Sequence, residues 1–222
     1  MAGAAVAFDL DGTLVDLRAV YVRAHQRTAE EVLSVELEES RVLELMRTGM
    51  PIRAHMALLD EAAADRLVEV FVERYRRERE GLARAFPDIP ELLASLRRTG
   101  VPIAVVTSKL REDARAELSA TGLDSEIDVL VAFEDTKDHK PHPAPHLEAL
   151  RRLGATAGVG VGDLPGDVAS ARDAGLEPIG VGWGYGAAAE LLAAGASCVC
   201  ETVAELCLRV ASVPHPDYPS GR

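Results

Sequence analysis

The chain has 222 residues, and its 36 acidic residues outnumber its 24 basic ones to give a formal net charge of −12. A chain of this length can bury a large core, either as one large domain or as a core with a small insert. Because an acidic surface repels phosphate groups, we expect no nucleic acid partner.

Cysteine content and hydropathy indicate the cellular compartment. Cys198, Cys200 and Cys207 are odd in number and lie late in the chain, which argues against a disulfide framework and favours packed thiols beside a strand. No apolar run approaches the roughly 18 residues of a membrane helix, and the first residues lack the basic region of a signal peptide. We therefore expect a soluble cytoplasmic protein with no membrane partner, as a monomer or a homodimer.

Residues 17–84 carry the periodicity of amphipathic helices. Apolar side chains recur every three or four positions, and the charged run at 73–80 is typical of a solvated helix face. The predicted helices span 17–35, 40–47, 52–59 and 65–82. Together they predict an all-helical insert over 17–84.

After Phe86 and Pro87, short apolar runs alternate with helical segments. Strands are predicted at 101–108, 129–133, 158–161, 179–181 and 197–200. Helices are predicted from 89 to before Gly100, at 112–120, at 147–153, over a segment ending at 174, at 187–194, and after Thr202 with Glu205 at capping-box spacing. This alternation predicts an α/β core with a doubly wound parallel sheet, formed by 1–16 and 85–222. Within it, 212–222 is expected to be a loose tail.

The first predicted strand, at 5–8, leads directly into Asp9, Asp11, Gly12 and Thr13. Side chains alternate along a strand, so Asp9 and Asp11 should point the same way. Two like charges about 4 Å apart cost roughly 4 kcal/mol at an effective dielectric near 20, so a cation or a shared proton must compensate. This pattern favours a site, and a solvated Asp-Gly turn is the alternative.

Polar residues also follow three later strands. Thr107 and Ser108 end one strand before a helix, Lys140 lies in a polar loop, and Asp163 and Asp167 follow another strand. Taken alone, these residues are typical of a helix cap, a surface lysine and a polar loop. However, ligands of doubly wound sheets bind beyond the carboxyl ends of the strands, where such loops meet.

The sequences DLDGTL at 9–14, Thr107-Ser108, Lys140 in Lys-Pro-x-Pro, and Asp163 to Asp167 resemble motifs I to IV of the haloacid dehalogenase superfamily. The resemblance implies a Rossmann-like parallel-sheet core, three layers in the order α/β/α, with a helical cap inserted after the first strand. It also implies that Asp9 is a nucleophile for a phosphoryl group and that Asp11 is the general acid and base. Thr107 would contact the phosphoryl group and Lys140 would balance the negative charge.

The same resemblance implies a Mg²⁺ cofactor. The metal would be held by the Asp9 carboxylate, the Asp11 carbonyl and the Asp163 carboxylate, with Asp167 binding directly or through water. The expected phosphate-binding residues are Leu10, Gly12, Thr13 and Ser108. Leu164 departs from the small hydroxyl residue usual in motif IV.

Residues in the cap and at the strand ends favour the phosphatase branch. Dehalogenases lack an aspartate at the position of Asp11. Phosphonate-cleaving members and sugar-phosphate mutases use a lysine of the cap, and 17–84 contains no lysine. A histidine expected in the mutases falls at Tyr21. The segments at 87–93 and 180–186 resemble the phosphoglycolate phosphatase and pyrophosphatase group.

We therefore expect a Mg²⁺-dependent phosphatase that acts on a small phosphorylated metabolite, similar to phosphoglycolate, through an aspartyl phosphate on Asp9. Arg53, or Arg47 nearby, is suited to a second anionic group of the substrate, with a surface arginine as the alternative for each. Activity on pyrophosphate or sugar phosphates, phosphotransfer to an acceptor, and an idle phospholigand-binding protein remain the other hypotheses.

Overall fold

The computed structural model describes residues 3–211, so the expected tail at 212–222 lies outside the described residues. The chain divides into two compact units. Met1–Val15 and Ala85–Arg222 form one, called here the core unit, and Asp16–Arg84 form the other, called the helical unit. The sequence predicts these divisions after residues 16 and 84.

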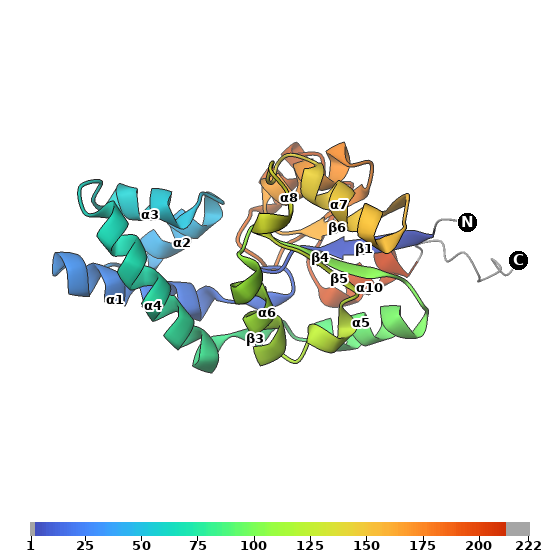
Figure 1. Cartoon of the computed structure of the whole chain (residues 1–222). Helices are drawn as coiled ribbons and strands as arrows, with labels where there is room; N and C mark the ends of the chain where they lie inside the picture. Colours follow the sequence, from blue (N-terminus) through green and yellow to red (C-terminus); the bar gives the residue numbers. More distant parts are fainter. Residues whose placement is uncertain (1–2, 212–222) are drawn as a thin grey trace, which may run out of the picture. The chain divides into compact units, whose positions relative to one another are not determined.

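The core unit contains a six-stranded sheet in the order β5-β4-β1-β6-β7-β8, in which neighbouring strands run parallel (Figure 1). The strands are β1 (Ala4–Phe8), β4 (Ile103–Val106), β5 (Val129–Val131), β6 (Ala157–Gly162), β7 (Glu177–Val181) and β8 (Cys198–Cys200). β1 is wholly buried between β4 and β6, as expected for a strand covered on both faces. The predicted α/β parallel-sheet class is confirmed.

Helices cover both faces of this sheet. The helices are α5 (Ile89–Arg98), α6 (Arg111–Ala120), α7 (Ala144–Leu153), α8 (Pro165–Asp173), α9 (Ala188–Ala193) and α10 (Val203–Val210), with short 3₁₀ turns η1 (Asp124–Glu126) and η2 (Phe133–Asp135). Figure 1 shows α7 and α8 on one face and α5 and α10 on the other. Within residues 3–211, no helix is both long enough and apolar enough to cross a membrane.

The structure shortens one predicted strand of the core unit and bears out only half of one predicted capping box. The strand predicted at 129–133 ends at Val131, because Phe133 begins η2, where it is 42% exposed and stacks on His139. At the start of α10 the Thr202 hydroxyl accepts from the Glu205 N–H at 3.2 Å, as the capping-box spacing predicts. The Glu205 carboxylate, however, accepts from the N–H of Glu201.

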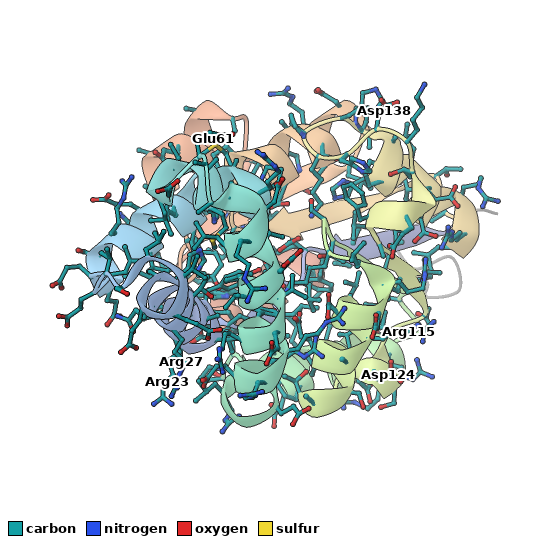
Figure 2. The ribbon with its side chains drawn as sticks, turned by 60° about the vertical axis from the view of Figure 1, so that its left-hand side comes forward. Arg23, Arg27, Glu61, Arg115, Asp124 and Asp138 are labelled. Atoms are coloured by element: carbon teal, nitrogen blue, oxygen red, sulfur yellow. The ribbon has the colours of Figure 1, made fainter. Side chains whose placement is uncertain are left out.

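The helical unit consists of α1 (Arg18–Leu33), α2 (Glu39–Arg47), α3 (Ile52–Leu59) and α4 (Ala64–Leu82). These helices bury one apolar face each, and α1 and α3 both pack against α4. Figure 2 shows Arg23 and Arg27 on the outside of α1, where both pair with Glu78 of α4. Two short strands that the sequence did not predict, β2 (Val15–Asp16) and β3 (Arg84–Ala85), pair with each other where the chain passes between the units.

Two histidines lie inside the helical unit. His25 on α1 is fully buried and His55 on α3 is 4% exposed, with ring centroids 5.8 Å apart. His25 Nδ1 donates to the carbonyl of Tyr21 at 2.8 Å, and its ring meets Phe71 edge-on. Burial lowers the pKa of each histidine to about 4, so both imidazoles are neutral at neutral pH.

These histidines should make the helical unit sensitive to acid. Their pKa is about 4 in the folded chain and near 6.5 when exposed, so the unfolded chain takes up protons first as the pH falls. Their contribution to the free energy of unfolding is complete above pH 6.5 and is lost as the pH falls toward 4. At about pH 5 the loss is about 2 kcal/mol per histidine. Urea unfolding at about pH 7.5 and about pH 5 measures this loss.

The variant His25→Gln/His55→Gln should lose less free energy of unfolding on acidification than the wild type. His142→Gln, at an exposed position of the core unit, is the matched control and should behave as the wild type does. An unchanged acid dependence in the double variant would show that the buried pair is not its source.

Candidate active site

The carboxyl ends of the central strands bring the predicted motifs to one edge of the sheet. Phe8 of β1 lies beside Val105 of β4 and Val161 of β6, so Asp9, Thr107 and Asp163 all follow at that edge. The Asp9 N–H donates to the carbonyl of Val161 at 2.8 Å, which extends the ladder to the site itself.

Lys140 joins two of the aspartates. Its ammonium donates to Asp9 Oδ1 and to Asp167 Oδ1, each at 2.7 Å, and its side chain is 6% exposed. Burial disfavours its charged form, but the charges of Asp167 and Asp9 outweigh burial and hold the pKa of Lys140 above its usual range. Lys140 is therefore an ammonium ion fixed inside the site.

Asp9, Asp163 and Asp167 form a buried acidic cluster, with one oxygen of each lying within 4.8 Å of the others. Burial, together with the charges of Asp167 and Asp11, raises the pKa of Asp9 to about 7 against the opposing charge of Lys140. Burial and the charges of Asp167 and Asp9 also raise the pKa of Asp163 well above its usual range. When ionised, three carboxylates facing one ammonium leave two negative charges uncompensated.

This cluster fits a divalent cation. Its donors are all carboxylate oxygens, the hard ligands that Mg²⁺ prefers, and the excess charge matches that of the ion. The Asp11 carboxylate is not part of this cluster. Its Oδ2 lies 3.0 Å from the ammonium of Lys109. The predicted contribution of the Asp11 carbonyl stays a prediction.

Asp163 is held in place by two loops. The Thr13 hydroxyl donates to its Oδ1 at 3.3 Å, and the N–H of Tyr185 donates to its Oδ2 at 2.8 Å. Thr13 therefore contacts Asp163. Its predicted contact with the phosphate stays a prediction. Gly12 has φ +79°, and a Cβ there would lie 2.8 Å from Asp163 Cγ, so only glycine fits this turn.

The remaining predicted phosphate-binding residues differ in exposure. Thr107 is buried, and its hydroxyl accepts from the N–H of Lys109 at 3.2 Å, whereas Ser108 is exposed. The Leu10 side chain is fully buried, so only its backbone can meet a ligand. In the helical unit, the exposed Arg53 pairs with Asp65 at 2.9 Å and Glu61 at 3.6 Å, and Arg47 is exposed on α2. Substrate contact by either arginine stays a prediction.

His146 follows the polar loop that carries Lys140, where the sequence predicts solvent-facing side chains, and for this residue the prediction is wrong. It lies on α7, is 1% exposed, and its Nδ1 is 2.7 Å from the hydroxyl of Ser170 on α8. Ser170 in turn donates to the carbonyl of His142 at 2.8 Å. Burial, and secondarily the charge of Lys140, lower the pKa of His146 to about 3, so this neutral side chain ties the segment after Lys140 to the helix carrying Asp167.

Sequence reasoning missed Lys109, Glu117 and Tyr185. Lys109 follows the Thr107-Ser108 pair directly and is one of three lysines in the chain, which is a usable signal. Glu117 could not be found this way, because a glutamate on an amphipathic helix is usually on the exposed face. Tyr185 acts here through its backbone N–H, which any non-proline residue would supply.

Residues 6–181 match the family described as haloacid dehalogenase-like hydrolase. The chain belongs to this family. The predicted family and hydrolase class are therefore confirmed, and the match spans all four motif regions of the core together with the helical unit.

Named relatives of this hydrolase are similar over most of their length. A phosphoglycolate phosphatase of Cupriavidus necator is 35% identical over 209 residues, covering 91% of this chain and 90% of that protein. Pyrophosphatase PpaX of Oceanobacillus iheyensis is 28% identical over 180 residues, covering 80% and 83%. Among solved structures, a mutant of CbbY from Rhodobacter sphaeroides in complex with xylulose 1,5-bisphosphate has a TM-score of 0.74 and 26% identity, covering 93% of this chain and 96% of that one.

The close packing around Asp163 predicts the effect of adding one methyl group. A Cβ at Gly184 would lie 2.6 Å from Asp163 Cγ, so Gly184→Ala should displace this carboxylate. We expect hydrolase turnover to fall on the order of tenfold or more, because small displacements of catalytic groups are costly. The melting temperature, followed by circular dichroism, should fall by only a few degrees.

Gly166→Ala is the matched control. A Cβ there would meet nothing within 4 Å, and alanine favours the helix α8 that Gly166 occupies. Turnover should stay within about twofold of the wild type. Equal losses in both variants would contradict a specific role for the space around Asp163.

Proposed function

We propose that this hydrolase is a Mg²⁺-dependent phosphatase, acting on a small anionic phosphomonoester similar to phosphoglycolate through an aspartyl phosphate on Asp9. The observation that carries the proposal is the buried acidic cluster bridged by Lys140. It holds a carboxylate at a strand end, fixes one of its oxygens with an ammonium, and retains an excess negative charge suited to a divalent cation.

Each residue has a distinct task in this proposal. Lys140 holds Asp9 Oδ1, which orients the other oxygen of Asp9 for attack on phosphorus as the bond to the leaving oxygen breaks. Asp11 gives a proton to that leaving oxygen, and later takes one from the water that hydrolyses the aspartyl phosphate. The Thr107 hydroxyl would bind an oxygen of the phosphoryl group.

The metal would be held by Asp9 and Asp163, with Asp167 completing the acidic surroundings. When bound, Mg²⁺ would supply positive charge that offsets the aspartates and the phosphoryl oxygens. Hydrogen bonds within the chain orient these carboxylates. Thr13 and the N–H of Tyr185 hold Asp163. Lys140 and the N–H of Leu164 hold Asp167.

The relatives favour small phosphorylated substrates. Proteins named phosphoglycolate phosphatase are 35% and 32% identical to this chain over more than nine-tenths of its length. Pyrophosphatase PpaX relatives make pyrophosphate the second candidate, and the CbbY complex with a sugar bisphosphate keeps sugar phosphates in the panel. Arg53 is the residue we propose to bind the second anionic group, by exchanging its surface partners for the substrate.

The wild type should release phosphate from an aryl phosphate in the presence of Mg²⁺ and lose this activity with a chelator. Asp9→Asn should lower turnover on the order of 10³-fold or more, because the attacking carboxylate is removed. Asp138→Asn is the matched control, since Asp138 is exposed in the loop that carries Lys140 and projects outward in Figure 2. Phosphate release that survives either the chelator or Asp9→Asn would contradict the mechanism.

A panel of phosphoglycolate, pyrophosphate, sugar phosphates and nucleotides then identifies the substrate. We expect the highest kcat/KM with phosphoglycolate, and a higher value with pyrophosphate would assign the second candidate. Product phosphorylation without free phosphate would instead indicate phosphotransfer, and binding without turnover would indicate an idle member of the family.

Metal binding can be tested without activity. Mg²⁺ at about 100 times its dissociation constant should stabilise the fold by about 2.7 kcal/mol, or roughly 5 to 10 °C in melting temperature for a chain of this size. The Asp163→Asn variant should show little of this increase, because it removes one buried ligand. Similar increases in the wild type and the variant would place the bound metal elsewhere.

A further inference from the structure

A second lysine lies at the carboxyl edge of the sheet, apart from the acidic cluster. The ammonium of Lys109 is 2.6 Å from Glu117 Oε1 and 3.0 Å from Asp11 Oδ2. The Lys109 side chain is 12% exposed and that of Glu117 on α6 is fully buried. A buried carboxylate is thus connected to Asp11 through one ammonium.

The backbone around Lys109 is fixed as well. Its N–H donates to the Thr107 hydroxyl at 3.2 Å, and its carbonyl accepts from the N–H of Phe133 at 2.8 Å. With the backbone held at one end and the ammonium held by Glu117 at the other, the position of the charge is set independently of Asp11. Lys109 can therefore impose an orientation on Asp11.

Stability alone is a weak reason for such an arrangement. Burying a carboxylate and an ammonium costs more solvation than a hydrophobic pair of the same volume, and such pairs are often replaceable without loss of stability. Glu117 lies on the same face of α6 as the buried Ala114 and Leu118, where an apolar side chain would pack. A charged residue at position 117 is explained if Glu117 fixes the Lys109 ammonium, which faces Asp11.

We propose that Lys109 is a positioning residue for Asp11, and that Glu117 anchors Lys109. This inference rests on the proposed phosphatase function, in which Asp11 gives a proton to the leaving oxygen and later takes one from water. Lys109 keeps its protons in both steps and acts by holding the Asp11 carboxyl group in one orientation. Asp9 and Asp11 would then each have a separate ammonium, Lys140 and Lys109.

The test uses a double variant, Lys109→Met/Glu117→Gln. Removing both charges avoids leaving Glu117 buried without a cation, so the fold should be retained, as thermal unfolding can check. With an aryl phosphate and Mg²⁺, we expect kcat to fall on the order of 10- to 100-fold and KM to stay within about twofold. Lys137→Met, at an exposed lysine, is the matched control and should leave kcat unchanged.

The same double change is then made in an Asp11→Asn background. If Lys109 acts through Asp11, the additional loss in kcat should be less than about twofold, since the residue it positions has been removed. An equal loss in both backgrounds would overturn the proposal, as would an unchanged kcat in the folded double variant. If the double variant does not fold, Glu117→Gln alone is used in both backgrounds. Its loss in kcat should be smaller than that of the double variant and should occur only when Asp11 is present.

The failure of this inference is distinguishable from failure of the proposed function. A wild type that does not release phosphate, or an Asp9→Asn variant that does, would contradict the function itself. Wild-type turnover that depends on Asp9 and is indifferent to Lys109 and Glu117 would contradict only the positioning role.

Discussion

The site depends on an imbalance of charge that the fold creates. Two strand ends and the first turn of α8 bring Asp9, Asp163 and Asp167 together, and burial removes the water that would stabilise three ionised carboxylates. Lys140 offsets one of these charges while contacting two of the side chains. When all three carboxylates are ionised, two negative charges remain, and the surroundings then favour a divalent ion over a second ammonium. Burial and the neighbouring carboxylates also raise the pKa of Asp9.

Hydrogen bonds between loops keep this repulsive arrangement together. The loop after β7 holds Asp163 through the N–H of Tyr185, and Trp183 from that loop donates its indole N–H to the carbonyl of Thr13 at 3.1 Å. Gly12 and Gly184 leave room that a Cβ would fill. A backbone N–H donor and the space left by two glycines thus position the Asp163 carboxylate, which the neighbouring negative charges alone would repel.

The two units bury polar groups by different means. The core unit keeps ammonium ions inside, each paired with carboxylates, because its site needs charge. The helical unit buries His25 and His55 as neutral imidazoles, and it places ion pairs such as Arg27 with Glu78 toward its outer surface. Neutral imidazoles gain protons only on exposure, so His25 and His55 make the helical unit sensitive to mild acid, and the buried His146 acts in the same way in the core unit.

The sequence by itself determined the class of the fold. Alternating strands and helices predict parallel strands, and parallel strands collect their following loops at one edge, where Asp9, Asp11 and Asp163 were expected. The resemblance of the motifs added Lys140 and Asp167 to the predicted site. Only the tertiary structure decided which side chains meet across long separations: Thr13 with Asp163, His146 with Ser170, and Lys109 with Asp11. The physical reason is that periodicity tells which face of an element is buried, whereas the partner on the opposing element depends on how helices and loops pack together in three dimensions.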